Sequence, residues 1–408
     1  MKDAKSKYTT LKQIVNKIPS HLVSKLARKH GVDKKSRAFS PWSHVVSLIF
    51  TQLAHSLSLN DVVDTLRNHK SSLFTIREAT PASRNGLSYA NRNRNSAMME
   101  ELFWEVLKSF QYYHPKFGYG RGYSGIPRRF KRAIYAVDST TIKLVANSVD
   151  WAKHRRRKAA AKCHMKLNLQ TFLPDYAVVK SASSHDSQEA IELCSSMKDG
   201  EIVIFDKAYV DFKHLYSLTE RGVFWVTRAK TNIAYEVMGQ HIGAVGDIHA
   251  DYQIKLKGVK TRNDYPDPFR IVQATVQIDG KEKEMSFITN NFSWASSSIC
   301  DLYKSRWGIE VFFKQMKQTL QLADFLGHNE NAVKWQIWSA LLTYIILRFI
   351  AFEAGWNHSF ARLFTVLRGT LWSRYDLSIM LQNYICGTAH GPPRTIAAPQ
   401  QSFLPGFL

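Results

Sequence analysis

The chain has 408 residues, of which 45% are hydrophobic and 12% aromatic, so it can bury the cores of about two to three domains and is not a disordered polyelectrolyte. Its formal net charge is +23 and its isoelectric point is about 9.8, which favours polyanionic partners, above all nucleic acid. An anionic membrane surface is the alternative, but the basic residues are spread along the chain and do not gather beside one apolar segment.

Cysteine usage and the N-terminal sequence predict a cytoplasmic protein. The widely separated cysteines show neither CxxC nor zinc spacing, which is typical of a reducing compartment and predicts no zinc site; they are Cys163, Cys194, Cys300 and Cys386. The N-terminal run MKDAKSKYTTLKQ lacks the apolar core of a secretory signal. The apolar run at 337–352 is shorter than the roughly 20 residues that a bilayer requires and includes Arg348. We therefore expect a buried helix there and no membrane partner.

Residues 1–113 are predicted to form an all-helical N-terminal domain. Apolar residues recur at spacings of three and four in LKQIVNKIPSHLVSKLARKH, WSHVVSLIFTQLAHSL and MMEELFWEVLKSF. The stretch TPASRNGLSYANRNRN places Arg84, Arg92 and Arg94 on a short predicted helix after a turn. Such a cluster is typical of a helix that contacts DNA phosphates and base edges, and a solvated helix face is the alternative.

The period of the hydrophobic pattern changes after a loop rich in Gly, Pro and charge, which we interpret as a basic linker over 114–132. The runs AIYAVDST and IVIFDKAY read as short buried strands that end in Asp138 and Asp206. Between them, KCHMKLNLQTF and YAVVKSA read as strands and SQEAIELCSSM as a helix. This alternation predicts an α/β fold class, with 133–222 as the first part of a core domain.

The next segment, 223–292, is predicted to be a β-rich insertion in that core. It contains the strand-like runs FWVTRAK, YQIKLKG, FRIVQATVQIDG and KEMSFITNN, with a hairpin signal at Asp279-Gly280. Helical patterns resume over 293–355, which we take as the second part of the core. Residues 356–408 are expected to form a C-terminal helical region and a loose tail.

The segment YKSRWGIEVFFKQMK, residues 303–317, is predicted to be an amphipathic helix with two distinct faces. At about 100° per residue, a polar stripe about 80° wide holds Tyr303, Arg306, Glu310, Lys314 and Lys317. A separate apolar face for the core holds Ile309, Phe312, Phe313, Met316 and Leu320. The polar stripe is either a solvated row of i, i+4 ion pairs or an acid that holds a metal between cations that bind phosphates.

Glu310 alone would make a poor magnesium site, because Mg²⁺ takes several oxygen ligands. Asp138 and Asp206 both follow buried strands, so neighbouring strands would place them side by side. Three carboxylates can hold two ions about 4 Å apart, which activate a nucleophilic oxygen and stabilise the leaving oxygen in phosphodiester chemistry. For each aspartate alone, a turn or cap role is the alternative, and Asp186 is the alternative aspartate for the site.

Three short motifs resemble the catalytic blocks of bacterial DDE transposases of insertion-sequence family four. They are DST from Asp138, DKAY from Asp206 and the Y-R-E-K signature Tyr303-x2-Arg306-x3-Glu310-x6-Lys317. The resemblance covers about residues 11–352. It implies a ribonuclease-H-like catalytic core with a β-rich insertion, preceded by the all-helical N-terminal domain and followed by C-terminal helices.

The resemblance also implies roles for individual residues. The metal ligands would be Asp138, Asp206 and Glu310, with Mg²⁺ as the cofactor and Mn²⁺ as its substitute. Phosphates of the DNA ends would be contacted by Tyr303, Arg306, Lys314 and Lys317, with Trp307 beside the active centre. In relatives, a tryptophan of the insertion stacks on a flipped base, and the candidates in this sequence are Trp294 and Trp225.

The implied activity is DNA transposition. Hydrolysis at each element end would free a 3′-hydroxyl, which then attacks target DNA. The implied partners are double-stranded DNA, namely the terminal inverted repeats and the target, and a second copy of the chain in a synaptic dimer. Such an enzyme would act in the cytoplasm at the nucleoid. Two alternatives stay open, namely a metal-dependent nuclease or resolvase of the same fold and a non-catalytic DNA-binding protein derived from a transposase.

Overall fold

The computed structural model describes residues 5–34, 36, 38–118, 130–144, 153–154, 158–181, 186–240, 246–278, 281–320, 327 and 329–384. The chain divides into two compact units. The first unit joins Met1–Phe117, Ile142–Ala161 and Phe313–Ile396, and the second joins Gly118–Thr141, Lys162–Phe312 and Ala397–Leu408. Packing thus groups the chain differently from the six predicted segments, whose boundaries stay a prediction.

The N-terminal part of the first unit forms helices where the apolar spacing predicts them. They are α1 (Thr10–Val15), α2 (Ser20–Lys29), α3 (Pro41–Ala54), α4 (Leu59–Asn68), α5 (Lys70–Phe74), α6 (Arg84–Asn93) and α7 (Ala97–Tyr113). Local sequence fixes several of their starts. The Ser40 side chain caps α3 and Pro41 occupies the first turn, while Ser58 and Asp61 form a reciprocal capping box on α4.

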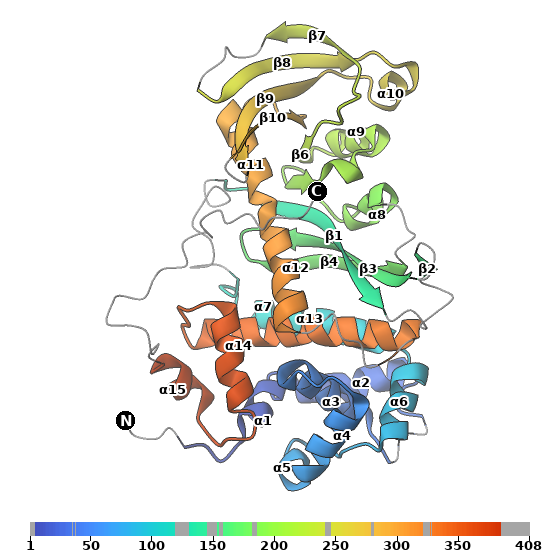
Figure 1. The fold of residues 1–408 in the computed structure, drawn as a ribbon, viewed down its shortest axis with the longest axis vertical. Helices are drawn as coiled ribbons and strands as arrows, with labels where there is room; N and C mark the ends of the chain where they lie inside the picture. Colours follow the sequence, from blue (N-terminus) through green and yellow to red (C-terminus); the bar gives the residue numbers. More distant parts are fainter. Residues whose placement is uncertain are drawn as a thin grey trace. The chain divides into compact units, whose positions relative to one another are not determined.

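The long helix α13 (Glu330–Glu353) forms the centre of the first unit (Figure 1). It packs against α1, α3, α6, α7 and α14 (Phe360–Gly369), and α15 (Leu377–Gln382) follows α14. Among the described residues, α13 is the one helix that is long and apolar enough to cross a membrane. However, 83% of its most apolar window is buried in the structure. The apolar run at 337–352 is therefore packed as part of a core helix, as predicted, although the helix that contains it is longer than the run itself.

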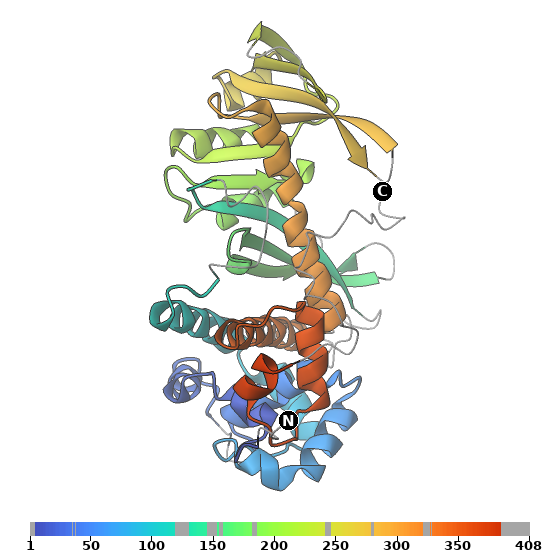
Figure 2. The same ribbon diagram turned by 90° about the vertical axis from the view of Figure 1, so that its left-hand side faces the viewer.

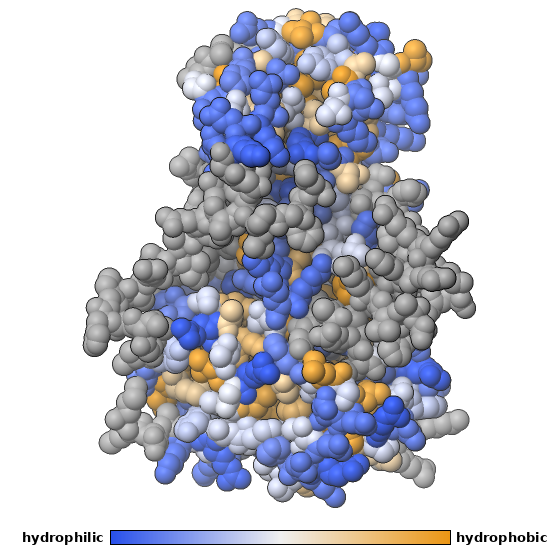
Figure 3. Space-filling model, in the orientation of Figure 1, coloured by the Kyte–Doolittle hydropathy of each residue, from blue (hydrophilic) through white to orange (hydrophobic). Residues whose placement is uncertain are grey.

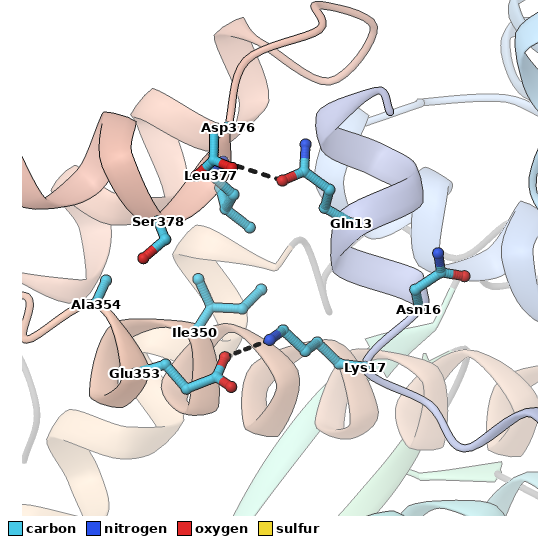
Figure 4. A pocket seen from close by; sticks show the side chains of 9 residues that line it. All are labelled: Gln13, Asn16, Lys17, Ile350, Glu353, Ala354, Asp376, Leu377 and Ser378. Atoms are coloured by element: carbon cyan, nitrogen blue, oxygen red, sulfur yellow. Dashed lines mark hydrogen bonds and ion pairs between the residues drawn. The ribbon is translucent and has the colours of Figure 1, made fainter. Parts of the chain in front are cut away.

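A hollow of about 390 Å³ opens in the first unit beside α1, α13 and α15 (Figure 4). Lys17 and Glu353 form an ion pair in its wall, and the Leu377 N–H donates to the Gln13 side chain at 3.0 Å. Lys17, Glu353 and Gln13 thus already have partners in the wall of the hollow. None of the predicted site residues lines it.

The second unit is built on one mixed sheet. Its strands are β1 (Ile134–Leu144), β3 (Lys158–Asn168), β4 (Leu173–Ser181), β5 (Ile202–Phe205), β6 (Phe224–Arg228), β7 (Tyr235–Gln240), β8 (Ile248–Leu256), β9 (Phe269–Ile278) and β10 (Lys281–Thr289). The order is β2-β3-β1-β5-β6-β10-β9-β8-β7, where β2 is Lys153–His154 and β4 pairs with β3. The pairs β1–β5 and β5–β6 are parallel, and β6–β10, β10–β9, β9–β8 and β8–β7 are antiparallel.

Helices cover both faces of this sheet. Along the chain they are α8 (Asp186–Leu193), the 3₁₀ turn η3 (Lys207–Tyr209), α9 (Phe212–Glu220), α10 (Val259–Asp264), α11 (Ser296–Ser305) and α12 (Trp307–Thr319). Both α9 and α11 contact β6, and they lie on opposite faces of it (Figures 1 and 2). The first strand of the predicted insertion, β6, thus continues the parallel part of the sheet. The strand-rich block that follows it is confirmed.

The hairpin predicted at Asp279-Gly280 is confirmed by the pairing around it. Those two residues lie outside the described residues, but Ile278 pairs with Lys281 in antiparallel register, as a two-residue connection requires. The surface over β7–β10 is mostly hydrophilic on the face that Figure 3 shows. The inner part of this block is packed on both faces, since the consecutive β9 residues Phe269–Val272 are all buried, whereas no residue of the edge strand β7 is buried.

A buried ion pair ties the antiparallel strands to the start of α11. Arg270 on β9 and Asp251 on β8 are both fully buried, and the Arg270 Nε donates to Asp251 Oδ1 at 2.7 Å. The Arg270 Nη1 also donates to the Trp294 carbonyl at 2.6 Å, and the Ser296 hydroxyl donates to Asp251 at 2.5 Å. Because every charge here has a partner, the network fixes where α11 begins.

We expect Arg270→Ala to lower the free energy of unfolding by about 3 to 5 kcal/mol, because it leaves the Asp251 carboxylate buried without its counter-charge. Denaturant unfolding measures this difference. Arg262→Ala, at an exposed position on α10, is the matched control and should change the stability by less than about 0.5 kcal/mol. Equal effects of the two substitutions would contradict the anchoring role of Arg270.

Candidate active site

The parallel pairing of β1 and β5 brings two of the predicted acids to the same level of the sheet. The register runs from Ile134 opposite Ile202 to Val137 opposite Phe205, and all four β5 residues are buried. The next residue of each strand is an aspartate, Asp138 or Asp206. The prediction that β1 ends at Asp138 is wrong, since β1 runs on to Leu144, but its pairing with β5 does stop before Asp138.

Asp206 also acts as the cap of a short turn. Its Oδ2 accepts the Ala208 N–H at 3.3 Å at the start of η3. Tyr209, at the end of η3, is buried, and its hydroxyl lies 3.4 Å from the Nδ1 of the buried His164 on β3. Asp206 therefore caps a turn, which was the alternative interpretation, and it also belongs to the acid cluster. The turn orients the Asp206 side chain.

The helix predicted at 303–317 is divided at Arg306. Helix α11 ends at Ser305 and α12 begins at Trp307, while Arg306 keeps right-handed helical dihedral angles. The Arg306 N–H donates to the Tyr303 carbonyl at 3.0 Å, and the Ile309 N–H donates to the Arg306 carbonyl at 3.0 Å. The junction is thus a tight turn and not a reversal, so the predicted faces persist. The apolar face is buried as predicted, at Ile309, Phe312, Phe313, Met316 and Leu320.

Two residues of the helical stripe contact all three predicted acids. The Arg306 Nη1 lies 3.0 Å from Asp138 Oδ2, and its Nη2 lies 2.5 Å from Glu310 Oε1. The Tyr303 hydroxyl donates to Asp206 Oδ1 at 3.4 Å. Carboxylates from β1, from the end of β5 and from α12 therefore converge around one guanidinium and one phenol.

The charges of this cluster depend on one another. Burial raises the pKa of Asp138 to about 6; the Arg306 charge and the Ser139 N–H oppose this rise, and the charges of Glu310 and Asp206 add to it. Burial alone would lower the pKa of Arg306, but Glu310 and Asp138 raise it above its ordinary value. The acids thus require a positive charge among them, and Arg306 supplies it.

The donor set of this cluster suits a divalent metal. Asp138, Asp206 and Glu310 offer only carboxylate oxygens, which are the ligands that Mg²⁺ and Mn²⁺ prefer. As they stand, no three Asp, Glu, His or Cys side chains in the described part of the chain form a ready metal site. The cation that two of the acids contact is the Arg306 guanidinium.

The other predicted DNA-binding residues take different positions. Trp307 is 47% exposed, and Lys314 is exposed and Lys317 half-buried farther along α12. Arg84 and Arg92 are exposed on α6, as a surface for DNA requires. For Arg94 the structure corrects the predicted contact with DNA. Its guanidinium donates to the Phe39 and Ser40 carbonyls and stacks on the Phe39 ring, so it fixes the end of α6.

The two candidate stacking tryptophans also differ. Trp225 is fully buried, donates to the Thr219 hydroxyl at 3.0 Å and packs with Tyr265 and Phe269, so it cannot present a face to a base. Its assignment is therefore wrong, because β6 lies inside the sheet. Trp294 is partly buried between Phe224 and Phe130, and its role stays a prediction. Asp186 begins α8, and its side chain lies outside the described residues.

Sequence reasoning missed a glycine that positions helix α12, which carries Glu310. A Cβ on Gly308 would lie 3.1 Å from Leu169 Cδ2 and 3.2 Å from Phe172 Cε2, in the buried connection between β3 and β4. The first turn of α12 can therefore approach that connection closely, two residues before Glu310. Glycine inside a helix is less favourable than alanine by about 1 kcal/mol. Its presence in the helical pattern at residue 308 was therefore a sign of close packing that the sequence offered.

Two family models match the chain. The model described as "Transposase DDE domain" matches residues 129–346, which is more than half of the chain and includes the acid cluster. A domain of unknown function matches residues 6–76, which hold α1–α5.

Individual proteins match as well. A probable transposase for insertion sequence element IS5377 of Geobacillus stearothermophilus is 27% identical over 54% of this chain and 58% of its own length. An inferred transposase, y4zB, of Sinorhizobium fredii is 28% identical over 65% and 75%. Transposase InsG for insertion sequence element IS4 of Escherichia coli is 25% identical over 46% and 42%. The chain thus spans about half to three quarters of these relatives.

The likeness to solved structures is weaker. The cryo-EM structure of a piggyBac transposase synaptic complex with hairpin DNA superposes on 95% of this chain and 86% of that chain. The TM-score is 0.46 and the sequence identity is 11%, so the superposition is too loose to define the fold.

We expect Gly308→Val to lower the free energy of unfolding by about 1 to 3 kcal/mol, because the added methyl groups overlap buried Leu169 and Phe172. Gly369→Val at the end of α14 is the control, since a Cβ there meets nothing within 4 Å. Thermal unfolding of both variants measures the difference. If the two variants melt alike, α12 does not depend on close packing at Gly308.

Proposed function

The chain belongs to the transposase DDE domain family, and from this premise we propose that it is a DNA transposase that cuts the ends of an insertion sequence and joins them to target DNA. One observation carries the proposal. The carboxylates of Asp138, Asp206 and Glu310, which are far apart in the sequence, meet around Arg306 and Tyr303. The same residues make up the motifs on which the family resemblance rests. The relatives described above support the assignment to insertion-sequence transposases, because several of them are named as such.

Asp138, Asp206 and Glu310 would hold Mg²⁺, or Mn²⁺ in its place, as members of this family generally use divalent metals. When bound, such ions would activate the attacking oxygen and stabilise the leaving oxygen. The acids supply the negative charge that retains them. The η3 turn orients Asp206, and the tight junction at Arg306 fixes the start of α12, which carries Glu310. Because these elements are rigid, the two acids would need little reorganisation during the reaction.

Two reactions on phosphodiesters would follow each other at this site. In the first, water attacks the phosphorus at the element end, and the bond to the 3′-oxygen breaks and leaves a 3′-hydroxyl. In the second, that hydroxyl attacks a phosphodiester of target DNA, so one P–O bond forms as another breaks. Neither reaction consumes an oxidant or a nucleotide cofactor. The chain's contribution is to bind, orient and exclude competing water.

We propose DNA contacts by the following residues of α11, α12 and the junction between them: Tyr303, Arg306, Trp307, Lys314 and Lys317. On α6 the contacts would be made by the exposed Arg84 and Arg92. The net charge of +23 supports binding to phosphates. Trp294 is the remaining candidate for stacking on a displaced base. The helices α1–α7 would read the terminal repeats, and a second copy would complete a synaptic dimer.

The sheet supports a ribonuclease-H-like core for this unit. Strand β1 lies between β3 and β5 in the order β4-β3-β1-β5-β6, and it pairs with β5 in parallel. The acids follow the paired parts of these two central strands. We further propose that the enzyme acts in the cytoplasm, where it would meet its DNA at the nucleoid.

We expect Glu310→Gln to reduce DNA cleavage and joining by at least about 10²-fold, because it removes a charge from the cluster while keeping the side-chain shape. The substrate is a plasmid that carries the gene with its flanking DNA, incubated with Mg²⁺ or Mn²⁺. Glu220→Gln, at the exposed end of α9, is the matched control and should retain activity. Cleavage that persists in Glu310→Gln contradicts the proposal, and cleavage without joining by the unaltered protein indicates a nuclease.

A further inference from the structure

The Arg306 guanidinium occupies the position where the acids of the proposed metal site need a positive charge. Its two terminal nitrogens contact Asp138 and Glu310, which come from different elements of the second unit. Its Nε is buried and has no hydrogen-bond partner among the described residues. The guanidinium is therefore bound by the acids but incompletely satisfied by them.

We propose that Arg306 is a displaceable internal counter-ion that competes with the divalent metal for Asp138 and Glu310 and that leaves them when it binds a phosphate. This inference rests on the proposed function, and it adds a regulatory role for one residue of the site. In the free protein Arg306 offsets part of the negative charge of Asp138 and Glu310. With DNA present, the guanidinium passes to a phosphate and the acids become available to metal.

The competition follows from the geometry. Asp138 Oδ2 and Glu310 Oε1 each accept a hydrogen bond from Arg306, so an ion on those oxygens would compete with the guanidinium for their lone pairs. An ion placed on the same oxygens would lie within a few ångströms of the guanidinium, where two positive charges repel strongly in a partly buried site. Metal binding is therefore more favourable when Arg306 moves away from these acids.

The position of Arg306 permits that movement. Its side chain keeps 14% exposure and lies at the junction of α11 and α12, with the guanidinium carbon 5.6 Å from the centre of the Tyr303 ring. A phosphate has two oxygens that can accept hydrogen bonds from the terminal nitrogens of Arg306, as the two carboxylates do in the free protein. A phosphate oxygen can also accept from the unsatisfied Nε. The exchange of partners therefore keeps the guanidinium paired.

The consequence is reciprocal coupling between phosphate and metal. If phosphate binding removes Arg306 from the acids, metal binds more tightly, and bound metal must strengthen phosphate binding by the same factor. The free protein would then hold little metal in a reactive arrangement. The competing interpretation is that Arg306 merely ties α12 to β1, in which case its removal would separate the acids and weaken metal binding.

Binding of Mn²⁺ to the full chain, followed by electron paramagnetic resonance of the free ion, separates these interpretations without measuring activity. We expect Arg306→Gln to bind Mn²⁺ about tenfold more tightly or better, because it removes a positive charge beside the ligands. Lys304→Gln, which removes a charge from an exposed neighbour on α11, is the control and should change the affinity little. Affinity that is unchanged or weaker in Arg306→Gln overturns the proposal. If that variant does not fold, as judged by circular dichroism, Arg306→Met, which also removes the charge, takes its place, with an affinity above that of the unaltered protein expected and an affinity at or below it overturning the proposal.

Sulfate tests the phosphate half of the inference as a tetrahedral oxyanion that the guanidinium can bind in the same way. Sulfate should tighten Mn²⁺ binding to the unaltered protein relative to chloride at equal ionic strength, and this gain should vanish in Arg306→Gln. Equal gains in both proteins, or none in the unaltered protein, overturn the coupling. Glu310→Gln tests the metal assignment itself. If Mn²⁺ affinity is unchanged in this variant, the ion binds at another place, and the proposed function is contradicted.

Discussion

The in-register parallel pairing of β1 with β5 is the constraint on which the candidate site depends. It sets Val137 opposite Phe205, so that the aspartates that follow, Asp138 and Asp206, emerge from neighbouring strands at one level. Successive residues of a strand face opposite sides of a sheet, so a slip of one residue would move one acid away from the other. The buried, apolar residues of both strands prevent that slip, because each has a place in the core. Hydrophobic packing thus fixes an arrangement of charges.

The third acid depends on a longer chain of contacts. Glu310 lies on α12, and α12 follows α11, whose start is held by the buried pair of Arg270 and Asp251. Gly308 then lets the first turn of α12 lie against the connection between β3 and β4. Three carboxylates gathered in this way repel one another, and Arg306 offsets that repulsion in the free protein. We propose that stability and catalysis require different partners for the same acids, and that DNA binding decides between them.

Local patterns in the sequence predicted much of this site. The helical stripe, the buried face at Ile309 and Phe312, and the aspartates after strand-like runs all depend on residues close in sequence. The partner of Arg306 could not be predicted in the same way. Asp138 lies 168 residues away, and its contact exists only once the sheet has formed. The sequence resemblance supplied the family, and the tertiary structure supplied the ion pairs.

The errors have a common physical origin. Trp225 and Arg94 were assigned to DNA from their residue type, but tertiary packing buries the first and engages the second with backbone carbonyls. Helix α9 and strand β7 were not predicted. For β7 the reason is that it is an edge strand without buried residues, so its sequence shows no clear alternation. The packing of α13 against α3 and α7 joins segments more than 200 residues apart, which no local pattern reveals. Burial, and not residue type, decides such cases.

The anomalous scattering of manganese in crystals of the protein bound to a DNA end is the most direct measurement of the central claim. The account predicts a manganese peak bounded by the carboxylates of residues 138, 206 and 310, with the guanidinium of residue 306 turned toward a phosphate. A peak at any other place, or the guanidinium still bridging residues 138 and 310 beside an ordered DNA end, would contradict it.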